Sequence, residues 1–254
     1  MLNTDESWEK FGKSDPYFGV LSSERYRTAG LTDELRAEFF GSGERHVDTV
    51  FATIRDHLDP AFSPRSALDF GCGVGRLAIP FARRIPRVIA ADVSDAMLSE
   101  AARNCVEQGV GNVAFVRSDD VLGSVPNGLD FIHSFIVFQH IPSARGFAIL
   151  HHMLGRLAEN GIGALHFTFT RHASWLRVLL QRVLEDVPFA VNFYNLARGR
   201  GFFNPDMQMR YYDLNRILDE LYLCGCQDVH VRFSDHEHSI GAMIYFRKRL
   251  VTSL

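Results

Sequence analysis

The stretch ALDFGCGVGRL, residues 67–77, decides the fold of this chain. Its apolar start is typical of a buried strand, and the three glycines that follow (Gly71, Gly73 and Gly75) indicate a tight turn into a helix. Glycine lets the backbone turn sharply and lets a ligand approach without meeting a Cβ atom. The start of the helix adds N–H groups that no intrahelical carbonyl satisfies. The stretch therefore predicts a strand–loop–helix unit that binds a ligand.

A second strand, VIAAD, ends in Asp92, sixteen residues after Arg76. A carboxylate at such a strand end is placed to accept hydrogen bonds from two ribose hydroxyls. The last glycine of the dinucleotide fingerprint Gly-x-Gly-x-x-Gly would fall at Arg76, and no P-loop lysine follows. Asp69 precedes the glycines, where it would stabilise the loop or receive a cationic amino group but would repel a pyrophosphate. The spacing predicts a site for a cofactor that contains adenosine.

Strands and helices alternate around this unit. This alternation predicts parallel strands joined by right-handed crossovers. Near the end of the chain the rhythm changes, because two strands follow one another with only a short connection, which predicts an antiparallel hairpin. The expected fold is α/β, a seven-stranded, mostly parallel, doubly wound sheet with an antiparallel last strand. The expected strands are 66–70, 87–91, 113–117, 129–135, 163–168, 228–234 and 241–247, and the expected helices are 46–58, 76–84, 95–108, 143–158 and 213–223.

Two aromatic segments have no place in this sheet, residues 1–45 and residues 171–212. The first contains turn signals such as Gly41-Ser42-Gly43, and the second contains an amphipathic helix over 175–184. Long segments of this kind usually cover a site. We expect both to form a cap over a core of residues 46–170 that residues 213–254 complete; the alternative is a second helical layer. The candidate substrate contacts of the cap are Tyr17, Phe18, Tyr194 and Tyr211.

The composition favours a globular protein that acts on small molecules. Its 254 residues, 46% apolar and 22% charged, suffice for one domain with an insertion or for two domains. A net charge of −3 argues against binding nucleic acid or an anionic membrane through bulk charge. The four cysteines form no Cys-x-x-Cys pair, so no zinc site is expected. Without an apolar leader or a run of about 18 apolar residues, the sequence predicts a soluble, cytoplasmic protein.

Four motifs in order resemble those of the class I S-adenosylmethionine-dependent methyltransferases. ALDFGCGVGRL looks like the first motif, VIAADVSDAML like the second, VRSDDV like the third and LDFIHSFIVFQHIP like the fourth. The final hairpin is similar to the reversed seventh strand of that fold. The resemblance covers about residues 46–170 and 213–248. It implies S-adenosylmethionine as cofactor and a small-molecule acceptor, because the motifs of amino-directed DNA methyltransferases and of ring-carbon methyltransferases are absent from the sequence.

The resemblance also implies roles for individual residues. Two of these assignments have ordinary alternatives: Met97 as a helix core residue, and Asp120 as a solvated loop acid. The implied cofactor contacts are Asp69, Gly71, Cys72, Gly73 and Gly75 in the loop, Asp92 at the ribose, Val93 and Met97 at the adenine face, Asp119 with Asp120 at the adenine amino group, and Ser134 with Phe135 at the methyl group.

His140 follows the fourth strand, at the expected methyl edge of the cofactor. Histidine titrates near neutral pH, so His140 is the candidate general base for a hydroxyl or protonated amine acceptor. It would otherwise orient the substrate or the cap, or pack in the core. The rival functions are an NAD-linked oxidoreductase and an S-adenosylmethionine-binding module without catalysis. No metal is expected, and the acceptor and the oligomeric state are not readable from the residues.

Overall fold

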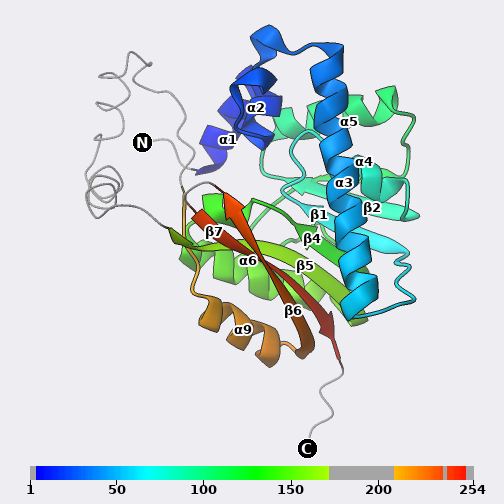
Figure 1. The fold of residues 1–254 in the computed structure, drawn as a ribbon, viewed down its shortest axis with the longest axis vertical. Helices are drawn as coiled ribbons and strands as arrows, with labels where there is room; N and C mark the ends of the chain where they lie inside the picture. Colours follow the sequence, from blue (N-terminus) through cyan, green and yellow to red (C-terminus); the bar gives the residue numbers. More distant parts are fainter. Residues whose placement is uncertain (1–3, 172–208, 237–238, 250–254) are drawn as a thin grey trace, which may run out of the picture.

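The computed structural model describes residues 4–171, 209–236 and 239–249. In this part of the chain a seven-stranded sheet of order β3-β2-β1-β4-β5-β7-β6 forms the centre of the molecule (Figure 1). The first five strands pair in parallel, whereas β7 runs antiparallel to both β5 and β6. The expected α/β fold with an antiparallel last strand is confirmed. The strands are β1 (Ser66–Phe70), β2 (Arg87–Asp92), β3 (Val113–Arg117), β4 (Leu129–Ser134), β5 (Leu157–Arg171), β6 (Cys226–His236) and β7 (Ser239–Lys248).

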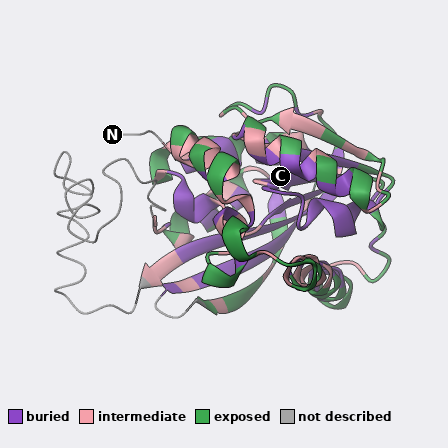
Figure 2. Ribbon diagram, turned by 90° about the horizontal axis from the view of Figure 1, so that it is seen from above, coloured by how far each residue is buried: buried purple, intermediate pink, exposed green. Residues whose placement is uncertain are grey.

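Helices cover both faces of the sheet, so side chains of either face of a strand become buried. Phe131 of β4 packs toward α3 and α4, and the next residue, Ile132, packs toward α6 and α9. Figure 2 shows the buried residues concentrated in the sheet between the helices. The helices of the first face are α3 (Asp33–His57), α4 (Ala78–Ala82) and α5 (Asp95–Glu107), and those of the second are α6 (Ser143–Arg156) and α9 (Leu214–Leu223) (Figure 1).

The N-terminal segment folds into α1 (Thr4–Ser14) and α2 (Pro16–Val20), followed by two 3₁₀ turns. Phe11 and Tyr17 of these elements form an apolar cluster with Phe39 of α3 and Met97 of α5. Tyr17 is 5% exposed, and its hydroxyl lies 2.9 Å from both Glu100 Oε1 and Asn104 Oδ1 of α5. These contacts hold the segment beside α5, next to the ends of β1 and β2.

The structure corrects the expected end of the N-terminal segment. Gly41-Ser42-Gly43, interpreted above as a break, lies inside α3, which begins at Asp33 after its cap Thr32. A Cβ atom on Gly43 would lie 2.1 Å from the carbonyl oxygen of Arg76. This glycine therefore serves a close approach between helix and loop, and packing outweighs its low helix propensity.

Other expected boundaries differ less. The expected helix over 76–84 is shorter, α4. Strand β5 is longer at both ends than expected, because it pairs with β4 from Leu157 and with β7 as far as Arg171. The expected helix over 175–184 and Tyr194 lie outside the described residues.

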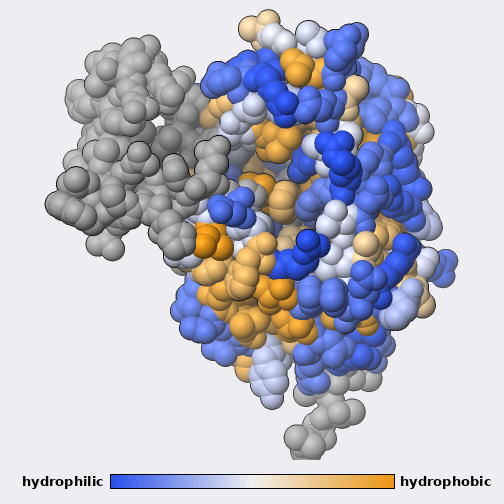
Figure 3. All heavy atoms as spheres, in the orientation of Figure 1, coloured by the Kyte–Doolittle hydropathy of each residue, from blue (hydrophilic) through white to orange (hydrophobic). Residues whose placement is uncertain are grey.

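The edge strand β6 exposes apolar side chains. Phe233 is 71% exposed, Val229 39% and Val231 37%, and Figure 3 shows hydrophobic surface gathered over β6. No helix within the described ranges combines the length and the apolar character that a membrane span requires.

Replacement of Gly43 tests the contact between α3 and the glycine loop. We expect Gly43→Ala to lower the free energy of unfolding by about 1–3 kcal/mol, because the methyl group would force the helix away from Arg76. Gly41→Ala is the matched control in the same helix, since the nearest atom to its Cβ would be Arg45 Nη1 at 3.5 Å. It should raise stability by about 0.5–1 kcal/mol. Urea unfolding of both variants measures the difference, and equal effects would contradict the packing argument.

Candidate functional site

A cavity of about 300 Å³ lies at the carboxyl ends of β1, β2 and β4. In the strand order the chain changes direction between β1 and β4, which is the usual place for a ligand in an open α/β sheet. The N-terminal segment forms its other wall. The lining includes Phe70, Gly71, Gly73, Asp92, Val93, Met97, Ser118, Asp120, Phe135–Val137, Gln139–Ile141, Arg145, Ile149, Met209 and Ser239, together with Thr4, Asp5, Trp8 and Gly19–Ser22 of the N-terminal segment.

The glycine loop passes between two walls that leave no space for side chains. Gly71 has φ +74°, and a Cβ there would lie 2.3 Å from Val137 of the loop after β4. Gly73 has φ +52°, and its Cβ would lie 2.4 Å from Val20 of α2. Both residues thus combine a left-handed backbone with a close approach, and glycine alone satisfies both conditions. The loop presents its bare backbone to the cavity.

Asp92, at the end of β2, anchors this loop while lining the cavity. Its Oδ2 accepts a hydrogen bond of 2.9 Å from Gly73 N, and its Oδ1 accepts one of 3.0 Å from Ser94 N. Burial raises the pKa of Asp92 to about 6, and these two N–H groups oppose that rise. The carboxylate has further acceptor capacity, because each oxygen has two lone pairs.

An ion-pair network closes the opposite side of the cavity. Arg145 of α6 donates from Nε to Asp120 Oδ1 at 2.7 Å, and from Nη1 and Nη2 to the two oxygens of Asp5 at 2.7 and 2.9 Å. Arg145 therefore joins α1, the loop after β3 and α6. Asp120 is thus an acid of the cavity wall that is paired with Arg145, while its side chain is still 48% exposed. The sequence contains no local signal for this network, since Asp5 and Arg145 are 140 residues apart.

His140 lies in a 3₁₀ turn, Phe138–His140, just after β4. It is 9% exposed, and its ring meets that of Trp8 edge-on, with centroids 4.9 Å apart. Its Nε2 lies 3.2 Å from the side-chain Nε2 of Gln139, whose Oε1 accepts a 2.7 Å hydrogen bond from Thr168. These contacts define the orientation of the imidazole at the cavity wall. The neighbouring Ile136 has φ 61°, a strained conformation for a β-branched residue.

A buried polar chain runs beneath the loop, on the face covered by α3 and away from the cavity. Asp69 Oδ1 lies 3.2 Å from His133 Nδ1, and His133 Nε2 lies 3.0 Å from His46 Nε2. Burial raises the pKa of Asp69 to about 7, opposed by Arg76, and burial lowers the pKa of His133 to about 3. Asp69 Oδ2 has no hydrogen-bond partner among the described residues. Asp69 is 2% exposed and is not part of the cavity lining, and its carboxylate faces His133.

Several other sequence candidates lie off the cavity wall. Tyr17 faces α5, as described above, and Phe18 stacks under the guanidinium of Arg27. Tyr211 reaches the cavity only indirectly, through a 3.4 Å contact between its hydroxyl and Ser239 Oγ, a residue of the lining.

Four of the predicted cofactor contacts lie around the cavity but not in its lining: Cys72 and Gly75 within the glycine loop, Asp119 bonded to Gly123 N, and Ser134 bonded to the carbonyl of Phe70. Met97 lines the cavity and is 1% exposed in the N-terminal cluster, and its contact with an adenine ring stays a prediction.

The sequence of residues 67–161 matches the family model described as "Methyltransferase domain". A trans-aconitate 2-methyltransferase of Pseudomonas paraeruginosa is 31% identical over 164 residues, which cover 59% of this chain and 56% of that protein. A 23S rRNA (uracil(1939)-C(5))-methyltransferase of Pseudomonas aeruginosa is 38% identical over 64 residues, 25% of this chain. The match spans only 14% of that relative's length.

Solved structures show the same fold at low sequence identity. Magnesium protoporphyrin IX methyltransferase from Synechocystis PCC 6803, with bound S-adenosylmethionine, has a TM-score of 0.59 at 18% identity, covering 98% of both chains. The [4+2]-cyclase SpnF has a TM-score of 0.57 at 15% identity, covering 81% of this chain and 80% of that one. The second example shows that this fold also supports other reactions.

Proposed function

Residues 67–161 belong to the class I S-adenosylmethionine-dependent methyltransferases, and from this premise we propose that the protein methylates an oxygen or nitrogen atom of a small molecule. The observation that carries the proposal is the cavity bounded by the bare glycine loop and Asp92 on one side and by His140 on the other. This arrangement would place a nucleoside-containing donor next to the position of an acceptor. Within the described residues, no feature of this cavity specifically supports the two rival functions, an NAD-linked oxidoreductase and a binding module without catalysis.

The residues of the cavity fit the cofactor of this family. Gly71 and Gly73 line the cavity with backbone atoms alone, in a conformation and a space that exclude a side chain, and Asp92 offers carboxylate oxygens at the end of β2. We assign Asp92 to the ribose hydroxyls, and Val93 with Met97 to the apolar face of the adenine. Asp120 then lies on the same wall as the adenine edge, its position held by Arg145.

When bound, S-adenosylmethionine supplies a methyl group on a sulfonium, which an in-line attack by a lone pair of the acceptor displaces. The leaving sulfide is neutral and needs no acid, so the protein acts mainly by positioning, which supplies up to about 7–11 kcal/mol. Phe135 and Ile136 border the cavity at the end of β4, where the acceptor would be held. His140 would take the proton of a hydroxyl or an ammonium acceptor.

Two features support a small acceptor over RNA. The cavity is bounded by the N-terminal segment, with Trp8 and Val20 in its wall, so it suits a compact molecule shielded from water. The net charge of −3 offers no general attraction to a polyanion. We propose that the N-terminal segment before α3, up to Thr32, forms the cap of this site together with the insertion 171–212. Most of that insertion lies outside the described residues.

Methyl transfer from radiolabelled S-adenosylmethionine tests the proposed function. We expect label to enter members of a panel of small carboxylic acids, phenols and amines, and not total RNA. The trans-aconitate methyltransferase is a reason to include unsaturated tricarboxylic acids. Label in RNA alone would overturn the small-molecule assignment, and cofactor binding without transfer to any compound would favour the non-catalytic alternative.

The ionisation of Asp92 should govern cofactor affinity. Ribose hydroxyls donate to the ionised carboxylate, so binding favours deprotonation, and affinity should rise as the pH increases through about 6 and then level off. Asp92→Asn should weaken binding of S-adenosylhomocysteine about tenfold or more at pH 8, and should remove most of this pH dependence. Calorimetric titration of both proteins, with NAD as a second ligand, measures this. Unchanged affinity in the variant, or tighter binding of NAD, would reject the assignment.

Replacement of His140 tests the proposed base. We expect His140→Ala to lower kcat about 100-fold or more, with the Kd of S-adenosylhomocysteine nearly unchanged, and to flatten the acid limb of the pH–rate profile. His152→Ala is the control, because His152 lies on α6 and is not part of the cavity lining. A variant that keeps the wild-type pH dependence would assign the proton transfer to another group.

A further inference from the structure

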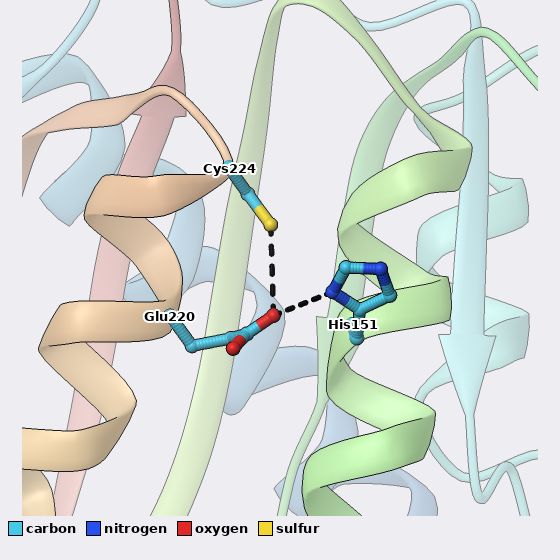
Figure 4. A group of neighbouring side chains, drawn as sticks. All are labelled: His151, Glu220 and Cys224. Carbon is cyan, nitrogen blue, oxygen red and sulfur yellow. Dashed lines mark hydrogen bonds and ion pairs between the residues drawn. The ribbon is translucent and has the colours of Figure 1, made fainter.

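Three side chains of metal-binding type meet between α6 and α9, away from the cavity. His151 Nδ1 lies 2.6 Å from Glu220 Oε1, and Cys224 Sγ lies 3.7 Å from the same oxygen (Figure 4). All three donor atoms lie within 4.8 Å of one another. Figure 4 shows the imidazole and the thiol pointing to the carboxylate from two different elements.

The local structure explains why these atoms converge. Glu220 and Cys224 are four residues apart at the end of α9, so their side chains lie on the same face of that helix. Cys224 is the C-cap residue, and the carboxyl end of a helix carries partial negative charge that favours a cation. His151 comes from the middle of α6, which packs against α9. A search for Cys-x-x-Cys pairs does not find such a set, because its members come from two distant segments.

We propose that His151, Glu220 and Cys224 form a three-ligand site for Zn²⁺ or a divalent transition-metal ion of similar preference. Thiolate sulfur, imidazole nitrogen and carboxylate oxygen are the ligands of zinc in proteins. The zinc–ligand lengths, at tetrahedral angles, place ligand atoms roughly 3.3–3.6 Å apart. The sulfur–oxygen distance is already close to this value.

The nitrogen–oxygen distance has to widen by somewhat less than 1 Å. The His151 side chain is 66% exposed, so a small change of its rotamer achieves this without moving the core. The same exposure leaves the fourth position of the metal open to water. The bound ion would replace the hydrogen bonds between the three side chains with stronger bonds and would join α9 directly to α6.

Cobalt spectroscopy tests the site on the untagged protein. We expect one equivalent of Co²⁺ to produce the near-ultraviolet charge-transfer band of a thiolate ligand, and Zn²⁺ to abolish it by displacement. Cys224→Ser should remove the band, and His151→Ala and Glu220→Gln should each weaken binding about tenfold or more. His152→Ala and Asp219→Asn are matched controls from the same two helices and should bind as the wild type does.

Circular dichroism of each variant verifies that it is folded, and hydrogen exchange supplies a second measurement. Zn²⁺ should slow amide exchange in α9 of the wild type but not of Cys224→Ser. Folded wild-type protein that gives no charge-transfer band, or a band that persists in Cys224→Ser, would overturn the proposal. Since the readouts do not involve methyl transfer, their outcome is independent of the proposed function.

Discussion

The hydrogen bond from Gly73 N to the Asp92 carboxylate is the interaction on which the site depends. It ties the loop after β1 to the end of β2, and the parallel pairing of these strands brings the two groups together. Because the loop has no side chains at Gly71 and Gly73, Val137 and Val20 can close on it from both sides. The carboxylate thus has a structural role before any ligand binds, and a substitution that removes its oxygens affects loop and ligand together. Replacement of Asp92 by asparagine disturbs the loop less than replacement by alanine, because the amide keeps one oxygen that can accept a hydrogen bond from the loop.

Beneath this loop the core contains an unusual amount of polarity. Asp69 and His133 are almost completely buried, and Arg76 is 6% exposed. Burial lowers the pKa of Arg76 to about 10 while it raises that of Asp69 to about 7, so each group is displaced toward its neutral form. Buried charges of this kind are tolerated when they are close to each other. The contacts from Asp69 through His133 to His46 connect β1 and β4 to α3, whose Gly43 approaches the Arg76 carbonyl.

Features set by local pattern were predictable from the sequence, and features set by distant contacts were not. Alternating strands and helices, the glycine loop and Asp92 follow from short-range periodicity and spacing, and the structure has all of them. The position of Gly43 inside a helix was misread, because its reason is a carbonyl oxygen more than 30 residues away. The ion pairs of Arg145 with Asp5 and Asp120 are not predictable from local sequence either, because the partners are 140 and 25 residues away. The motif predicts that Asp69 stabilises the loop or contacts the cofactor, whereas the alternation of side chains along β1 turns the carboxylate toward α3.

The fold and the side chains around the cavity contribute differently to function. The fold is shared with proteins as different as a porphyrin methyltransferase and a [4+2]-cyclase, so the fold alone does not select the reaction. We expect selection of the acceptor to depend on side chains at the cavity wall outside the glycine loop: Trp8 of the N-terminal segment, Arg145 with its two acids, and His140 beside Gln139. In this chain the N-terminal segment is held by Asp5 to Arg145 and by Tyr17 to α5. The N-terminal segment, which would contact the acceptor, is therefore attached at two points to the domain that would bind the donor. A change in the position of this segment would therefore affect the donor site as well as the acceptor site.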